Sequence, residues 1–191
     1  MNEYDGTDYN PYAVVNATSN DLAAKRLSDK GDSMTTREIL LESVAAIKLK
    51  QYFQNHDNRI DDFDSAYDEI FKTIEIEKSG NKFDQLSVNN IDRLLADIEK
   101  GKKDVAYITD DNGEVVYHLY LIQRYLLDNP ELTITLIPRS RQNGVDASFD
   151  DILQIMSYPV FDTLKKLYKD KRFKIVKDST RMGGIDLLRA S

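Results

Sequence analysis

The chain has 191 residues and no cysteine, and it carries 26 Lys and Arg against 33 Asp and Glu, for a net charge of −7. The acidic balance argues against a nucleic acid partner, because such binding depends on basic residues that neutralise phosphates. The absence of cysteine excludes disulfides, thiolate metal sites and cysteine nucleophiles. No apolar run reaches the roughly 18 residues of a membrane span, and the amino terminus shows no signal core, which predicts a soluble, cytoplasmic protein without a membrane partner.

Helical periodicity dominates the first half of the chain. Residues 11–30 have apolar side chains at helical spacing, and Gly31 follows them as a stop signal. Residues 35–55 form a second predicted helix, whose start fits a capping box made by Thr35 and Glu38. Two further helices are predicted over residues 57–78 and 91–98, the last one closed by Gly101.

The pattern changes at Asp104. Short runs typical of strands cover residues 104–109, 132–138 and 173–176, and helical patterns lie between them at residues 115–129, from Ser148 onward and after Pro159. Strands that alternate with helices predict a parallel sheet with right-handed crossovers. The predicted fold class is therefore α/β. A helical amino-terminal part spans residues 1–101 and a small three-layer part with a parallel sheet spans residues 102–191, together in one compact unit.

The loop after the first predicted strand is rich in carboxylates. If residues 104–109 form a buried parallel strand, Asp110 and Asp111 lie at its carboxyl end, where open α/β sheets bind their ligands. Adjacent carboxylates there suit a hard divalent cation. An EF-hand loop does not fit, because Val115 and Leu121 stand where it needs glycine and glutamate.

A β-hairpin is the alternative interpretation of the same loop. Asn112-Gly113 is a strong hairpin signal, and the residues after Glu114 include many strand formers. Two observations favour a strand, a loop and a helix instead. The apolar residues after Glu114 follow helical spacing, and the segment up to Asp128 is long for a strand.

The loop after the second predicted strand adds a third carboxylate. Loops that follow neighbouring parallel strands lie side by side, so we expect Asp146 to face the two earlier aspartates, with Arg139 and Arg141 adding positive charge. Three carboxylates around a cation, with arginines nearby, suit a phosphate ester. The alternative is that Asp146 only caps the following helix and that the arginines are solvated. His56 and His118 are interpreted as ordinary residues, so a histidine-based metal site is disfavoured.

Residues 110–116, Asp-Asp-Asn-Gly-Glu-Val-Val, resemble the Asp-Asn-x-Gly-Glu-Ile-Val signature of the metal-dependent damage-control phosphatases, long catalogued only as a domain of unknown function. Further segments resemble blocks of that family in the same order: residues 10–12 (Asn-Pro-Tyr) with 19–20 (Ser-Asn), residues 80–84 (Gly-Asn-Lys-Phe-Asp), residues 145–151 (Val-Asp-Ala-Ser-Phe-Asp-Asp) and residues 183–187 (Gly-Gly-Ile-Asp-Leu). The order and spacing of the blocks make the match more specific than any one of them.

The resemblance implies a Rossmann-like core and a divalent metal (Mg, Mn, Co or Ni) held by Asp110, Asp111 and Asp146. Asp111 stands where the family has asparagine, and the extra charge should tighten cation binding and weaken binding of an anionic substrate. The candidate substrate-binding residues are Asn81, Asp84, Gly113, Glu114, Arg139 and Arg141.

Two departures from the family bear on catalysis. Family members carry a cysteine pair in an amino-terminal helix, which this chain lacks. They also continue into a Lys-Gly-x-x-Asn loop that supplies a lysine to the substrate phosphate. The chain ends at Ser191 before such a loop, so it resembles a truncated or minimal version of the family.

The leading hypothesis is a metal-dependent phosphatase of small phosphorylated metabolites, with Asp110 and Asp111 as catalytic residues. Asp111 is either the nucleophile or a metal ligand in a reaction where water attacks the phosphate directly. The sequence leaves both routes open. The second hypothesis is a catalytically impaired module that binds a metal or metabolite and pairs with another chain or with a second copy of itself. Carboxyl methyl transfer is disfavoured, because no Gly-x-Gly-x-x-Gly loop follows a strand.

Overall fold

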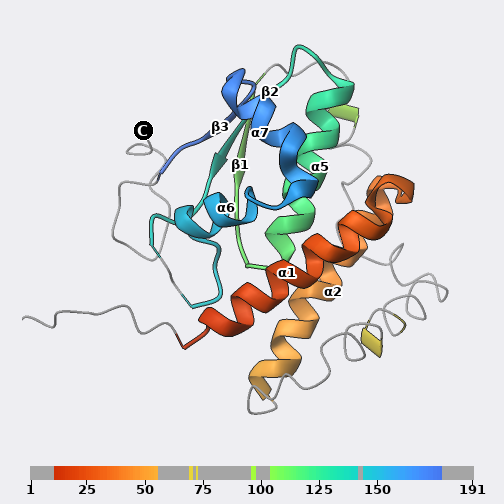
Figure 1. Cartoon of the computed structure of the whole chain (residues 1–191), viewed down its shortest axis with the longest axis vertical. Coiled ribbons are helices and arrows are strands. Elements are labelled where there is room, and N and C mark those ends of the chain that lie inside the picture. The colour runs from red at the N-terminus through yellow and green to blue at the C-terminus, as the bar shows by residue number, and fades with distance from the viewer. Residues whose placement is uncertain are drawn as a thin grey trace, which may run out of the picture.

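The computed structural model describes residues 11–55, 69–70, 72, 96–97, 104–141 and 144–177 (Figure 1). Its elements in chain order are α1 (Ala13–Lys30), η1 (Gly31–Ser33), α2 (Thr36–Asn55), β1 (Asp104–Ile108), α5 (Glu114–Asp128), β2 (Thr133–Ile137), α6 (Phe149–Ile155), η3 (Pro159–Phe161), α7 (Asp162–Lys169) and β3 (Phe173–Ile175). The third and fourth predicted helices lie outside these residues, apart from 69–70, 72 and 96–97, which are helical.

The predicted start of α2 is confirmed and the end of α1 differs in detail. The backbone N–H of Thr35 donates to the Glu38 carboxylate at 2.6 Å, and the N–H of Glu38 donates to the Thr35 hydroxyl at 3.2 Å. Gly31 follows α1 as predicted, but its φ of −54° is helical, and the chain continues into η1. The glycine is needed for close packing, because a Cβ there would lie 2.9 Å from the Tyr120 ring.

Three parallel strands form the sheet of the described region, in the order β1-β2-β3. The register pairs Asp104 with Thr133 on β1 and β2, and Ile134 with Phe173 on β2 and β3. Each predicted strand is present, and its ends differ from the expected bounds by at most one residue. The predicted α/β class, a helical half with a small Rossmann-like parallel sheet, is confirmed.

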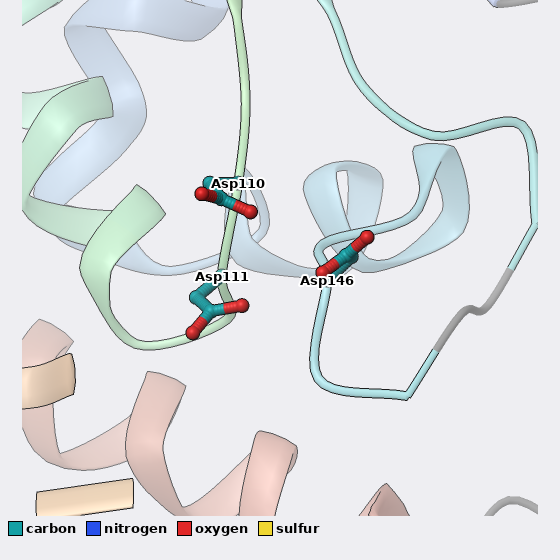
Figure 2. A group of neighbouring side chains, drawn as sticks. All are labelled: Asp110, Asp111 and Asp146. Atoms are coloured by element: carbon teal, nitrogen blue, oxygen red, sulfur yellow. The ribbon is translucent and has the colours of Figure 1, made fainter. Parts of the chain in front are cut away.

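The hairpin interpretation of residues 110–114 is wrong, because the helix α5 begins at Glu114. The chain leaves β1, turns at Gly113 with a φ of 82°, and enters α5 directly. At the carboxyl edge of the sheet, the loops that follow β1 and β2 run beside each other (Figure 2). The topology thus places the two carboxylate-bearing loops together.

α5 is the central helix of the described region. It packs against α1 and α2 and also against β2 and α7, and the side chains of Val116, Tyr117 and Leu119 are wholly buried. Because neighbours cover it on most sides, its apolar residues do not form a single stripe.

No helix of the described residues is long and apolar enough to cross a bilayer.

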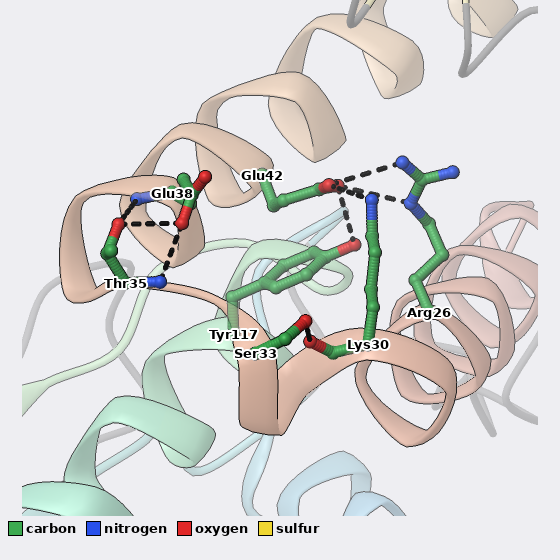
Figure 3. A network of polar contacts seen from close by, with 7 residues as sticks. All are labelled: Arg26, Lys30, Ser33, Thr35, Glu38, Glu42 and Tyr117. Carbon is green, nitrogen blue, oxygen red and sulfur yellow. Dashed lines mark hydrogen bonds and ion pairs between the residues drawn. The ribbon is translucent and has the colours of Figure 1, made fainter.

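A buried carboxylate joins α1, α2 and α5 (Figure 3). Glu42 of α2 has no exposed surface, and its two oxygens accept hydrogen bonds from the Arg26 guanidinium at 3.1 and 3.2 Å. The Lys30 ammonium lies 2.8 Å from the same carboxylate, and the Tyr117 hydroxyl donates to it at 3.4 Å. The network holds α1 in one position over the start of α5.

Candidate metal centre

Backbone hydrogen bonds tie the loop after β1 to the loop after β2. The N–H of Ala147 donates to the carbonyl of Asp110 at 2.6 Å, and the N–H of Asn112 donates to the carbonyl of Val145 at 2.9 Å. Asp111 and Asp146 face each other as an antiparallel pair. The position of Asp146 opposite Asp111 is therefore fixed by main-chain contacts.

The three predicted carboxylates lie together. One oxygen from each of Asp110, Asp111 and Asp146 lies within 4.8 Å of the others, and Figure 2 shows the three side chains on the two neighbouring loops. Asp110 is exposed and the other two are half-buried. At such separations two carboxylates repel by about 1 kcal/mol in water and about 3.5 kcal/mol at an effective dielectric constant near 20.

Arg139 supplies part of the compensating charge. Its Nε atom lies 3.0 Å from Oδ2 of Asp146, and both side chains are partly exposed. Arg139 was predicted to contact a substrate phosphate, and it forms an ion pair with Asp146. Arg141 is exposed, and within the described residues no hydrogen bond or ion pair joins it to the three carboxylates.

Asp146 does not cap the helix that follows, so this part of the alternative is wrong. The N-cap of α6 is Ser148, whose hydroxyl accepts a hydrogen bond from the N–H of Asp151, while the Asp151 carboxylate accepts from the N–H of Ser148 at 2.8 Å. This capping box agrees with the prediction from Ser148 and Asp151. It leaves the Asp146 carboxylate directed at Arg139 and the other two aspartates.

Asn112 is a site residue that the sequence analysis did not select. It is fully buried, and its Nδ2 donates to the carbonyls of Val145 and Asp146, both at 3.2 Å. Its Oδ1 accepts a hydrogen bond from Nδ2 of Asn20 at 2.9 Å, and Oδ1 of Asn20 accepts from the N–H of Gly113 at 2.6 Å. The two amides connect α1 to both loops.

One face of α1 borders the centre. Asn16, Ser19 and Asn20 are buried and share a face by their spacing of three and four residues. Asn16 donates to the carbonyl of Gly144 at 3.2 Å. These small polar residues lie on an otherwise apolar helix face. A buried amide needs a hydrogen-bond partner, so their presence there was the sequence signal for a polar contact with another part of the chain.

Glu114 and Gly113, two predicted substrate-binding residues, contact other parts of the protein. The Glu114 carboxylate lies 3.5 Å from Nε2 of His118, whose ring packs edge-on against Tyr107. Burial lowers the pKa of His118 from 6.5 to about 4, so the ring is neutral at neutral pH. At Gly113, a Cβ would lie 3.0 Å from the Cβ of Ser19. The predicted roles of both residues in substrate binding stay predictions.

The remaining candidates lie outside the described residues. Asn81 and Asp84 are not among them, and neither are the segments 80–84 and 183–187 that contributed to the resemblance. Their predicted place near the pocket stays a prediction.

Comparison with solved structures identifies the fold. No known family profile matches the chain, and no curated protein matches it either. The crystal structure of a DUF89 family protein from Pyrococcus horikoshii matches 96% of this chain with a TM-score of 0.62 and 15% sequence identity. The two proteins share a fold. The match covers 55% of the archaeal chain, so the present chain spans about half its length. The predicted resemblance to a family long catalogued as a domain of unknown function is thereby confirmed at the level of the fold.

Proposed function

We propose that the protein is a metal-dependent phosphatase of small phosphorylated metabolites, of the damage-control type. The observation that carries the proposal is the convergence of Asp110, Asp111 and Asp146 at the carboxyl edge of a parallel sheet. The fold shared with a DUF89 family protein supports it, because the sequence blocks of this chain resemble the same family.

The donor atoms fit a divalent cation. Two oxygens bound to one Mg²⁺ or Ca²⁺ are separated by at most about twice the bond length of 2.0–2.6 Å, or about 4–5 Å, and the three carboxylate oxygens lie within 4.8 Å. All three donors are hard oxygen ligands, which favour Mg²⁺ or Mn²⁺ over metals that prefer sulfur. Arg139 offsets part of the negative charge of the group, and a bound cation would offset more of it.

When bound, a divalent cation polarises the phosphoryl group and lowers the pKa of a coordinated water. The protein residues provide the remaining functions. Asp110, the most exposed of the three, presents its carboxylate where a substrate arrives, and Arg139 keeps Asp146 oriented. Arg141 is an exposed positive charge near the same loop and would attract an anionic substrate. Asp111 acts either as the nucleophile or as a ligand, and trapping of an acyl-phosphate would distinguish the two routes.

The test is hydrolysis of a generic aryl phosphate in the presence of Mg²⁺, Mn²⁺, Co²⁺ or Ni²⁺. We expect turnover that depends on the metal and falls at least about 100-fold in Asp110→Ala, as for loss of a group that orients charge in the transition state. Asp104→Ala is the matched control, because Asp104 is an exposed aspartate at the opposite end of β1. Absence of metal-dependent turnover, or turnover that survives Asp110→Ala, would reject the phosphatase.

A cation-binding module that pairs with another chain is the second candidate. The observation that favours it is the exposed surface of β1, the edge strand of the described sheet, where Ile108 is 51% exposed. Exposed apolar edges promote pairing with another strand or chain. Tight cation binding in calorimetry, without hydrolysis of any phosphate ester, would support this candidate over the enzyme.

A further inference from the structure

Asn112 joins the two loops that carry the metal-binding candidates. Besides the carbonyls of Val145 and Asp146, its Nδ2 lies 3.3 Å from Oδ2 of Asp151, so one buried amide contacts the second loop and the cap of α6 together. Its own backbone N–H adds a further bond to Val145. A change in the position of this amide would therefore change the spacing between Asp111 and Asp146.

Asn20 in turn holds Asn112 from the helical side of the molecule. Its amide gives one hydrogen bond to Asn112 and accepts one from Gly113, so both of its polar atoms are engaged with the loop after β1. Ion pairs hold α1 against α2, because Arg26 and Lys30 of α1 bind the buried Glu42 of α2. The connection is long-range, since 92 residues separate the two asparagines.

The loops need such support because their side chains repel one another. Three carboxylates lie within 4.8 Å, and like charges at that distance favour separation of the loops when no cation is bound. Small cations such as Mg²⁺ demand near-ideal geometry at about 2.0–2.1 Å, whereas Ca²⁺ accepts flexible coordination at about 2.3–2.6 Å. Binding of the smaller ion therefore depends more strongly on a fixed loop spacing than binding of Ca²⁺ does.

We infer that Asn20 is a positioning residue for the cation site: acting through Asn112, it fixes the spacing of the carboxylates and so contributes more to the binding of small divalent cations than to the binding of Ca²⁺. The inference rests on the proposed cation site and says nothing about hydrolysis. Residues that orient ligands without touching the metal have large effects on affinity, about 10- to 100-fold in other sites.

Calorimetric titration of the full chain with Mg²⁺, Mn²⁺ and Ca²⁺ tests the inference. Asn20→Ala should weaken Mg²⁺ and Mn²⁺ binding about tenfold or more, with a smaller loss for Ca²⁺, so that the ratio of the Ca²⁺ to the Mg²⁺ Kd falls. Gln123→Ala is the matched control. Gln123 is a buried amide that bridges α5 to Val160 and Leu164, away from the site. Its loss should lower the melting temperature and leave the ratio of Kd values unchanged.

An unchanged ratio in Asn20→Ala, or an equal shift in Gln123→Ala, would overturn the inference and leave the cation site standing. Absence of cation binding by the wild type would instead reject the site itself. A second measurement needs no variant. In the wild type, addition of Mg²⁺ should shift the NMR signals of the Asn20 and Asn112 side-chain amides. The signal of Asn129, whose amide binds Tyr125 within α5, should stay in place. Unmoved Asn20 and Asn112 signals in a protein that binds Mg²⁺ would equally contradict the role of Asn20.

Discussion

Single residues decide the charge and shape of the candidate metal centre. Asp111 stands where the resembling family has asparagine, and the next residue, Asn112, is the buried amide that holds the loops. The sequence therefore keeps an amide at the centre but moves it one position along the chain. Its hydrogen bonds go to the protein, while Asp111 contributes a carboxylate to the cluster.

Replacement of Asp111 by asparagine tests the effect of the extra charge. Asp111→Asn removes one of three negative charges around the cation, so we expect the Kd for Mn²⁺ to rise about tenfold, equivalent to about 1.4 kcal/mol. An anionic substrate should bind more tightly, because less negative charge opposes it. Titration calorimetry and the KM for an aryl phosphate measure the two effects. An unchanged Kd would show that the charge of Asp111 does not contribute to cation binding.

His118 makes stability depend on pH in a defined window. Burial lowers its pKa in the folded protein from 6.5 to about 4, so between these values the unfolded chain binds more protons than the folded one. Stability is therefore full above about pH 6.5 and falls as the pH drops toward 4. The loss is roughly 3 kcal/mol, from about 1.4 kcal/mol for each pKa unit.

Urea unfolding of the wild type and of His118→Gln between pH 4 and 7 measures this effect. The difference between the two proteins cancels the contribution of Glu114 and the other carboxylates to first order. The slope of stability against pH should be smaller in the variant across that window. Equal slopes would mean that His118 titrates normally in the folded protein.

At the scale of elements, α1, α2 and α5 depend on one buried carboxylate. Glu42→Gln keeps the side-chain shape but removes the charge that Arg26 and Lys30 face. Breaking a buried ion pair costs about 3–5 kcal/mol, and the partial exposure of both cations reduces this to about 2–3 kcal/mol. Glu38→Gln on the same helix is the control, because Glu38 lies in an exposed capping box. Thermal unfolding should show a larger loss for Glu42→Gln, and equal losses would contradict the role of the network.

Most of the elements from Asp104 onward could be predicted from the sequence. Each strand is a short apolar run, and α6 begins with a local capping box at Ser148, so the signals lie within a few residues of the elements they specify. The alternation of strands and helices then predicts that two loops meet at one sheet edge, which brings Asp110, Asp111 and Asp146 together.

The support of the site was not predictable in the same way. The contact between Asn20 and Asn112 joins residues 92 positions apart, and no local sequence pattern indicates which two residues will pair. The ion pair of Arg139 with Asp146 depends on the path of the loop between them. The close packing of Gly31 at the end of α1 involves Tyr120, which comes from another helix. In each case tertiary packing, and not local sequence, decides the partner.

At the scale of the whole molecule, the fold joins a helical part to a parallel sheet through the central helix α5. The fold is shared with a DUF89 family protein about twice as long as the matched region. The candidate metal centre lies where α1 meets the two loops at the sheet edge, so contacts from both parts of the chain shape it.

The most direct measurement is a crystal structure of the full chain with Mn²⁺, using the anomalous signal of the metal. We predict one anomalous peak about 2.0–2.6 Å from a carboxylate oxygen of each of Asp110, Asp111 and Asp146, and loss of the peak in Asp146→Ala. A map without a peak at this position, or with Mn²⁺ bound only elsewhere on the acidic surface, would contradict the proposed metal centre.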